Sequence, residues 1–321
     1  MAKKYFSDAM RDALREEMKR DERIIILGED VKVSPYGYTR GLFEEFPGRV
    51  LNTPIAEQTT IGVTLGAAMC GLRPFTDLMM GNFFYTGWDQ LANQVAKLRY
   101  MTGGQFSVPA VFASTIGVGG NVGAQHSDVP YAQMVNLGGI KVVVPSSPYD
   151  AKGLLKSAIR EDNPVIFLAP TGLIGVKDEV PDEEYLIPLG RSEVKQEGKH
   201  VSIIAVGAMV KKAFNASKKL AKEGISVEIV DPRTLHPMDY ESILQSVAKT
   251  GRLVVVDEAR EACGIASQVA AHIAEYGYRH LKAPIVRVAS KNVPVPFSPP
   301  MEDFVVPGVD QIVQAVHKVI R

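Results

Sequence analysis

The sequence has few cysteines and no excess of charge, and both features exclude whole classes of protein. Only Cys70 and Cys263 are cysteines among 321 residues, and they lie far apart among small or apolar neighbours. Such a pair predicts neither a disulfide framework nor a thiolate metal site, and it fits a reducing, cytoplasmic compartment. Basic and acidic residues number 36 each. Because no basic block stands out, the charge pattern argues against nucleic acid as the main ligand.

Long apolar runs are also missing. No segment approaches the roughly 20 apolar residues that a membrane-spanning helix requires. The N-terminal segment instead predicts an amphipathic helix with Met10, Leu14 and Met18 on one stripe, rather than a secretory apolar core. We therefore expect no membrane partner.

Short β-branched runs alternate with helical patterns, which indicates an α/β fold with parallel sheets. Candidate strands lie at 24–27, 74–78, 108–113, 141–144 and 165–168, then at 201–206, 227–230 and 253–256, and a helix is expected near 309–320. Between 171 and 200 the pattern dissolves into an acidic, proline-bearing segment. We expect a first domain over residues 1–185, a linker over 186–199 and a second domain over 200–321.

One carboxylate stands directly before a helix of small and apolar residues. Glu57 follows Asn52-Thr53-Pro54-Ile55-Ala56, and no charged residue occurs from Thr59 to Gly71. An acid at the mouth of such a helix is costly to bury without a task or a partner, which makes Glu57 a candidate for chemistry. The alternative is an ordinary carboxylate at the positive end of a helix. The residues alone leave both interpretations open.

A glycine-rich loop and a histidine follow the predicted strand at 108–113. Glycines occur at 117, 119, 120 and 123, but the third glycine of a dinucleotide-binding fingerprint would fall at Val122, so that fingerprint fails. We still expect this loop to let the backbone approach a ligand closely. His126 lies at a strand-to-helix connection, where functional groups gather, although an ordinary loop histidine is the alternative.

Aromatic and sulfur-containing side chains are concentrated between Met79 and Gln90, immediately after a predicted strand. Ligands of open α/β sheets bind outside the carboxyl ends of the strands, so this stretch is a candidate slot for a flat ring. Core packing accounts for most of these residues, and we expect one or two to touch a ligand.

Several ordered segments together resemble one family. They are 52–58, 78–83, 88–90, 96–101, 125–127, 147–155 and 231–235. The chain resembles the β subunit of the thiamin diphosphate-dependent first component of 2-oxo acid dehydrogenase complexes, a family of pyruvate, branched-chain and acetoin enzymes. The resemblance covers nearly the whole chain. It implies two doubly wound α/β domains, a transketolase-like pyrimidine-binding domain and a transketolase C-terminal domain.

The resemblance also implies roles for individual residues. Glu57 takes the position of the glutamate that hydrogen-bonds the aminopyrimidine of the cofactor, for which the carboxyl must reach within about 2.6–3.2 Å. Phe83 matches the aromatic residue that stacks on the pyrimidine, and Met79 lies where the pocket of that ring is lined. His126 matches a histidine near the reacting carbon, suited to hold a substrate carboxylate or to move protons.

One absence implies a partner. In this family a Gly-Asp-Gly segment and a later asparagine hold the diphosphate and its magnesium, and no Gly-Asp-Gly occurs in this sequence. The resemblance therefore implies an α subunit that supplies this half of the site, in an α2β2 assembly with a second β subunit. It also implies docking to a lipoyl acyltransferase core.

Further implications concern a metal and the substrate. The family often carries a structural potassium ion held by main-chain carbonyls, and the matching positions here are Ala110, Ala158, Ile159, Glu161 and Asn163. Asp128 stands where relatives usually have glutamine, beside the substrate end of the site, so both acetoin and a 2-oxo acid stay open as substrates. Two rivals remain, the C-terminal half of a split transketolase and a non-catalytic assembly subunit.

Overall fold

The computed structural model describes residues 2–321, which form two compact units. The first contains the chain up to Ile116 and Gln133–Leu189, and the second contains Gly117–Ala132 and Gly190–Arg321. The sequence analysis assigned residues 117–132 to the first domain. The structure groups them with the second because this segment bonds to the strand Leu253–Arg260 of that unit.

The first unit is built on a parallel sheet in the order β6-β7-β5-β4-β2-β3. Its strands are β2 (Ile24–Gly28), β3 (Val50–Asn52), β4 (Arg73–Met80), β5 (Val111–Ile116), β6 (Lys141–Val143) and β7 (Val165–Pro170). Strands β5 and β7 are buried along their whole length. This is why they read as continuous apolar runs rather than alternating ones.

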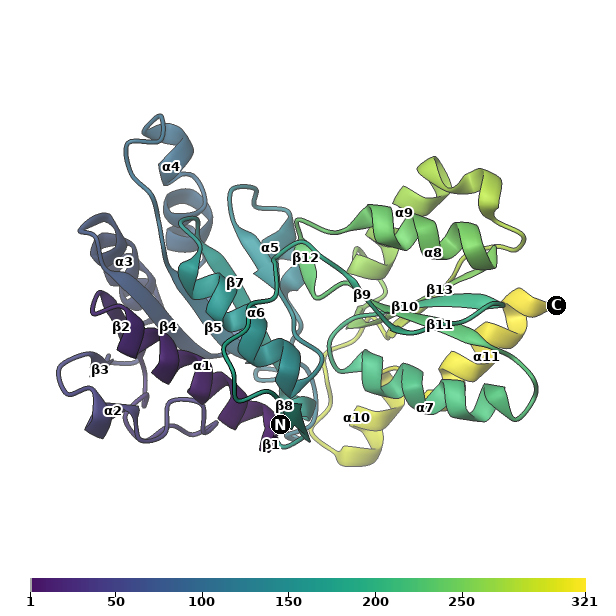
Figure 1. Ribbon diagram of the computed structural model, residues 1–321, viewed down its shortest axis with the longest axis horizontal. Helices are drawn as coiled ribbons and strands as arrows, with labels where there is room; N and C mark the ends of the chain where they lie inside the picture. The colour runs from purple at the N-terminus through teal and green to yellow at the C-terminus, as the bar shows by residue number, and fades with distance from the viewer. Residues whose placement is uncertain (1) are drawn as a thin grey trace. The chain divides into compact units, whose positions relative to one another are not determined.

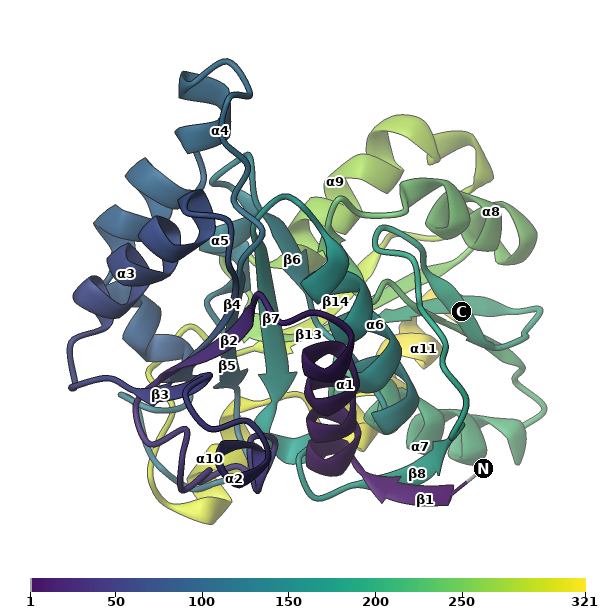
Figure 2. The ribbon, with the colours of Figure 1, turned by 60° about the vertical axis from the view of Figure 1, so that its left-hand side comes forward.

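Helices cover both faces of this sheet (Figures 1 and 2). They are α1 (Phe6–Arg20), α2 (Leu42–Glu45), α3 (Glu57–Met69), α4 (Leu98–Met101), α5 (Tyr131–Val135) and α6 (Pro148–Arg160). Helices α1 and α6 lie side by side on one face, and α3 packs against β4 on the other. The predicted stripe of Met10, Leu14 and Met18 on α1 is confirmed, since all three side chains are buried.

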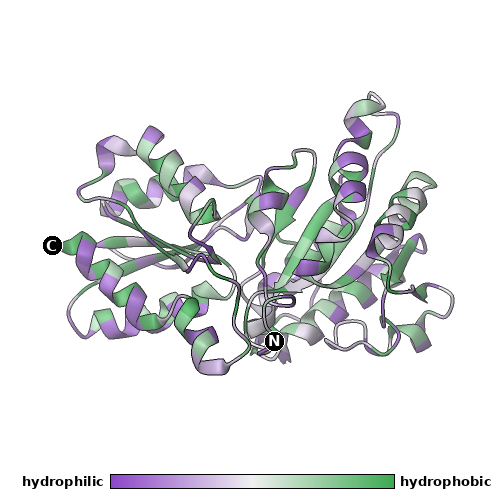
Figure 3. Ribbon diagram, turned by 180° about the vertical axis from the view of Figure 1, so that it is seen from behind, coloured by the Kyte–Doolittle hydropathy of each residue, from purple (hydrophilic) through white to green (hydrophobic). Residues whose placement is uncertain are grey.

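The second unit contains a sheet in the order β14-β13-β10-β11-β9, in which only β9 runs antiparallel to its neighbour. Its strands are β9 (Glu193–Gln196), β10 (Val201–Ala205), β11 (Val227–Asp231), β13 (Leu253–Arg260) and β14 (Val286–Ser290), and β12 (Thr234–His236) follows β11. Its helices are α7 (Met209–Ala221), α8 (Tyr240–Thr250), α9 (Ile265–Tyr276), α10 (Pro299–Val305) and α11 (Val309–Ile320). Helices α7 and α11 contribute to one buried apolar cluster with β10, β11 and β13. Figure 3 shows the hydrophobic colour along the sheets and the mixed colours of the amphipathic helices.

The interval at 171–200 is more structured than expected. Strand β8 (Lys177–Val180) pairs antiparallel with β1 (Ala2–Tyr5), and β9 lies inside the predicted linker. Both are edge strands made largely of charged residues, Lys-Asp-Glu-Val and Glu-Val-Lys-Gln. Edge strands tolerate such residues, so no hydrophobic pattern marked them. Within residues 2–321, no helix has the length and apolar content needed to cross a membrane.

Candidate active site

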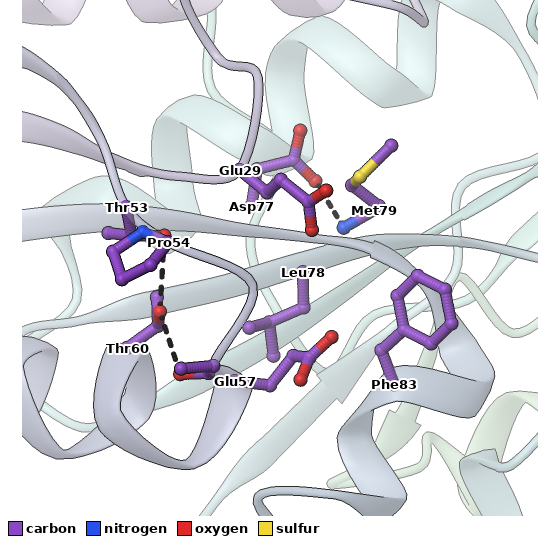
Figure 4. A pocket seen from close by; sticks show the side chains of 10 residues that line it. Glu29, Thr53, Pro54, Glu57, Thr60, Asp77, Leu78, Met79 and Phe83 are labelled. Atoms are coloured by element: carbon purple, nitrogen blue, oxygen red, sulfur yellow. Dashed lines mark hydrogen bonds between the residues drawn. The ribbon is translucent and has the colours of Figure 1, made fainter.

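A small pocket opens in the first unit at the carboxyl ends of β2 and β4 (Figure 4). It is lined by Glu29, Thr53, Pro54, Ala56, Glu57, Thr60, Asp77, Leu78, Met79 and Phe83. The structure therefore brings together Glu57, Met79 and Phe83, the three residues that the sequence assigned to the pyrimidine. The location follows the general rule for open parallel sheets.

Glu57 is the first residue of α3, and its carboxylate does not act as the helix cap. The residue before it, Ala56, provides no side-chain cap, and Oε2 of Glu57 lies 2.9 Å from the Thr86 hydroxyl. That hydroxyl also lies 2.8 Å from the carbonyl oxygen of Phe83. A hydroxyl has one proton to donate and two lone pairs with which to accept. A charged Glu57 can accept from Thr86, and a protonated Glu57 can donate to it while Thr86 bonds Phe83, so the contact accommodates both forms.

Met79 is held by its backbone at a kink in β4. Its φ of 56° lies in the left-handed region, and the pairing of β4 with β5 shifts register between Asp77 and Met80. The Met79 N–H donates to Oδ1 of Asp77 at 2.8 Å, and its carbonyl accepts from Thr115 at 2.8 Å. A bulge of this kind redirects side chains at a strand end. Here it turns the chain toward the half-buried Phe83, whose side chain completes the pocket wall.

Two further carboxylates line the same pocket, and the sequence analysis did not identify them. Asp77 is buried, accepts from the Tyr38 hydroxyl at 2.7 Å, and burial raises its pKa to about 6. Burial, followed by the charges of Asp30 and Glu57, raises the pKa of Glu29. Figure 4 shows the carboxyl groups of Glu29 and Asp77 close together, while Glu57 extends on the side of Phe83. Both acids therefore hold their protons to a higher pH than free carboxyl groups do.

Gly28 is the reason that Glu29 and Asp77 can meet. Its φ is +151°, and a Cβ at this position would lie 2.4 Å from the carbonyl oxygen of Asp77. Only glycine allows that backbone approach, because any side chain would collide with β4. The signal available in the sequence was positional, since acids that follow neighbouring parallel strands end at the same edge of the sheet.

His126 belongs to the second unit, on the loop within Gly117–Ala132. The side chain is half-buried, and the backbone N–H of His126 donates to the Gly123 carbonyl at 3.2 Å. The glycine-rich part of this loop does approach another group closely, but the group belongs to the protein. Gly117 has φ +75°, and a Cβ there would lie 2.4 Å from Oε1 of Glu258. At Gly117 the close approach is therefore to β13, and the expectation of a ligand along the rest of the loop stays a prediction.

Four of the five residues matched to a potassium site gather at the C-terminal end of α6, where Ala158 and Ile159 form part of the last turn and Glu161 follows it. The Arg73 guanidinium donates to the carbonyl of Ile159 at 2.9 and 3.0 Å and to that of Glu161 at 2.7 Å. A carbonyl oxygen has two lone pairs, so the Ile159 oxygen is fully used by Arg73, whereas the Glu161 oxygen retains one lone pair. The fifth carbonyl, that of Ala110, accepts from the Val165 N–H at 3.0 Å. The Arg73 guanidinium therefore occupies part of the carbonyl group that the resemblance assigns to an ion, and the potassium site stays a prediction.

Acidic and metal-ligating side chains do not suggest another metal site. Within residues 2–321, no group of three or more histidine, cysteine, aspartate or glutamate side chains is arranged to hold a metal ion. The two cysteines are exposed and unbonded to each other.

Comparison with known proteins gives one consistent result. The model of the transketolase pyrimidine binding domain matches residues 2–177, and that of the transketolase C-terminal domain matches residues 190–312. The chain is 43% identical over 325 residues to the beta subunit of acetoin:2,6-dichlorophenolindophenol oxidoreductase from Cupriavidus necator, covering 98% of this chain and 96% of the relative. It is 42% identical over 325 residues to the beta subunit of the pyruvate dehydrogenase E1 component from Bacillus subtilis, covering 100% of both.

Among solved structures, a split-gene transketolase described as an inactive beta4 tetramer superposes with a TM-score of 0.82 at 28% identity, covering 98% of this chain and 97% of that one. Its similarity supports the α/β fold of both units. The relatives in sequence are named as subunits, so they are parts of larger enzymes. The chain belongs to the transketolase-like family and, within it, to the β subunits of the thiamin diphosphate-dependent first component of 2-oxo acid and acetoin dehydrogenases.

Proposed function

We propose that this β subunit binds the aminopyrimidine half of thiamin diphosphate in the pocket of Glu57, Met79 and Phe83. The observation that carries the proposal is the convergence of a carboxylate, a thioether and an aromatic ring on one pocket at the end of β4. When bound, thiamin diphosphate supplies the carbanion chemistry that cleaves a carbon–carbon bond next to a carbonyl group. The chain supplies the orientation of the cofactor and the proton at Glu57.

Glu57 is proposed as the acid that hydrogen-bonds N1′ of the pyrimidine. The Thr86 hydroxyl can hydrogen-bond the carboxyl group of Glu57 whether or not that group carries a proton. A group that holds and releases a proton requires such a partner. Phe83 is proposed to stack on the ring and Met79 to line its edge, because flat rings and polarizable sulfur pack favourably on aromatic surfaces. His126 is proposed to hold the substrate carboxylate or to transfer a proton to the substrate.

The remaining half of the cofactor site is proposed to come from an α subunit. No Gly-Asp-Gly occurs in this chain, and within residues 2–321 no cluster of acidic side chains is arranged to hold magnesium. We propose an α2β2 assembly in which the α subunit binds the diphosphate and magnesium, and which passes the acyl group to a lipoyl acyltransferase. The proposed substrate is acetoin or a 2-oxo acid.

A potassium ion is proposed at the carbonyl oxygens of Ala110, Ala158, Ile159, Glu161 and Asn163. Its support is that four of these five residues lie at the end of α6, where the last carbonyl oxygens of a helix lack the usual partners four residues on, although the Ala158 carbonyl accepts from the Glu161 N–H. An ion that binds only the folded state stabilises it by mass action, by about 2.7 kcal/mol at 100 times its dissociation constant. Thermal unfolding in potassium chloride and in choline chloride at equal ionic strength tests this, and equal melting temperatures would exclude the site.

The rival assignment to a split transketolase receives less support. Identity falls from 43% for the acetoin enzyme subunit to 28% for the split-gene transketolase. A non-catalytic assembly subunit would have no need to keep Glu57 and Phe83 in one pocket.

The test is reconstitution with a purified α subunit that bears Gly-Asp-Gly. We expect thiamin diphosphate-dependent reduction of 2,6-dichlorophenolindophenol with acetoin or a 2-oxo acid, and no such activity from either subunit alone. Ketol transfer between sugar phosphates provides the comparison assay. Activity of the isolated chain, or sugar transfer without dye reduction, would contradict the proposal.

A further inference from the structure

The loop that carries His126 is tied together at its two ends. The Gly117 N–H donates to the Asp128 carbonyl at 3.2 Å, so the residues before and after the histidine meet. A closed loop of this kind moves as a unit, and its position is set by the contacts at its base. Three of those contacts come from the last four residues of β13, and a further one comes from Glu302 of α10.

Three residues at the end of β13 each hold a different point of the loop. Oε1 of Glu258 accepts from the Val118 N–H at 2.8 Å. The Arg260 guanidinium donates to Oδ1 of Asp128 at 2.7 Å, and the Tyr131 hydroxyl donates to Oδ1 of Asp257. We call Asp257, Glu258 and Arg260 the β13 clamp.

A bulge explains how neighbouring strand residues reach the same loop. In a regular strand, successive side chains point to opposite faces. The pairing of β13 with β14 shifts register between Asp257 and Arg260, which turns these side chains out of strict alternation. The Ser290 hydroxyl fixes this region by donating to the Glu258 carbonyl at 2.6 Å.

Glu258 is the residue of the clamp that packs most closely against the loop. Its side chain is buried, and Gly117 packs so closely on the carboxyl group that only a residue without Cβ fits there. The neighbouring Gly119 N–H donates at 3.3 Å to Oε1 of Glu302, a second buried acid. Val118 is half-buried, so a shift of the loop away from β13 would cost this hydrogen bond to the buried carboxylate of Glu258.

The ion pair between Arg260 and Asp128 sets the charge close to His126. Asp128 lies two residues after the histidine, and Arg260 neutralises it. Without Arg260, the carboxylate of Asp128 would lose this neutralising partner close to a histidine proposed to bind an anionic or carbonyl-bearing substrate.

We propose that the β13 clamp positions His126, with Glu258 as the central positioning residue. This inference rests on the proposed role of His126 in the reaction. A displacement of a catalytic group by about 1 Å can lower the rate about 100-fold. The clamp therefore affects turnover without touching the cofactor or the substrate.

The test uses Glu258→Ala, which removes the acceptor, and Glu258→Gln, which retains an oxygen for the Val118 N–H. The matched control is Glu228→Ala, another buried acid of the same unit, which bonds Lys249 and not the loop. Arg260→Met removes the second anchor and serves if Glu258→Ala fails to fold. Amide hydrogen exchange over residues 117–132, and the rate at which diethylpyrocarbonate modifies His126, are read by mass spectrometry on the full chain and on the α/β complex.

We expect Glu258→Ala to speed exchange at residues 118–120 at least 10-fold and to increase the modification rate of His126 several-fold. In the complex kcat should fall 10- to 100-fold with KM within about threefold of wild type. Glu258→Gln should restore most of the loss, and Arg260→Met should act in the same direction as Glu258→Ala. Unchanged exchange over 117–132, or equal losses of kcat in Glu258→Ala and Glu228→Ala, would overturn the clamp.

Failure of the proposed function would look different. An inactive wild-type complex, or full activity of His126→Ala, would refute the proposed reaction or the role of His126. Exchange and modification would still decide whether the clamp fixes the loop, because neither measurement requires turnover.

Discussion

Replacing Asp77 with asparagine should change how the stability of the protein depends on pH. Burial raises the pKa of Asp77 to about 6 from its ordinary value of 3.8. The folded state therefore binds the proton of Asp77 more tightly than the unfolded chain does. The resulting stabilisation is fully present below pH 3.8 and is lost as the pH rises through 6.

The size of the effect follows from the two pKa values. Each pKa difference of 1 corresponds to 1.36 kcal/mol, so a rise from 3.8 to about 6 corresponds to about 3 kcal/mol. Asp77 is 3% exposed, so little solvent screening reduces it. Hydrogen bonds from Tyr38 and from the Met79 N–H favour the charged carboxylate, but burial is the larger effect.

The assay is urea unfolding of wild type and Asp77→Asn between pH 4 and pH 8. An asparagine oxygen can accept the same two hydrogen bonds, and it never carries a charge. The free energy of unfolding of the variant, relative to wild type, should therefore increase by about 2 kcal/mol from pH 4 to pH 8, since part of the full effect is already lost at pH 4. Tyr38→Phe, which removes one donor, should shift the wild-type transition to higher pH. A difference between variant and wild type that is independent of pH, or that decreases as pH rises, would refute the reasoning.

Three further predictions concern other parts of the first unit. Glu57→Gln in the α/β complex should lower kcat about 10²- to 10⁴-fold, as expected for loss of a general acid, and unchanged dye reduction would assign the proton to another group. Arg73→Met removes the donors to the carbonyls of Ile159 and Glu161, and it should lower the free energy of unfolding in urea by about 2–4 kcal/mol. Arg73→Lys should recover part of that loss, and a neutral effect of Arg73→Met would show that water or an ion replaces the guanidinium. Burial raises the pKa of Glu17, but hydrogen bonds from Arg160 and Arg20 outweigh it and hold this pKa below its ordinary 4.5. Glu17 therefore stabilises the folded state above pH 4.5, and this contribution is lost as the pH falls below that value. In urea titrations, Glu17→Gln should reduce the loss of unfolding free energy at acid pH.

The strands of the two sheets were predictable because burial on both faces leaves a continuous apolar run. β7 and β10 are examples, since each is buried at every residue and each was expected within two residues of its observed end. β9 could not be predicted from its own residues, because Glu-Val-Lys-Gln has no hydrophobic pattern and forms a strand by pairing with β11. The strand predicted at 253–256 was also shorter than the observed one. β13 continues through Asp257–Arg260, whose polar side chains are buried or paired by residues more than 100 positions away.

The candidate site was predictable in part for a related reason. Glu57, Met79 and Phe83 were brought together by the resemblance to a family, and the rule for parallel sheets supported only the aromatic stretch after β4 as a ligand slot. Glu29 and Asp77 required knowledge of which strands are neighbours. Gly28 pairs with Asp77 across β2 and β4, which places the next residue, Glu29, beside that acid. Pairing order is a tertiary property, and periodicity alone does not contain it.

The division of the chain into two interleaved units determines how it can be taken apart. The polypeptide passes between the units after Ile116, after Ala132 and after Leu189. A single cut at the third crossing yields an N-terminal fragment that keeps His126 but loses Asp257, Glu258 and Arg260. Val118 would then lose its hydrogen bond to Glu258, and Asp128 its ion pair with Arg260. Limited proteolysis or gene truncation should therefore give fragments whose exposed segment 117–132 is degraded first, and a soluble first unit would require replacing that segment with a short linker.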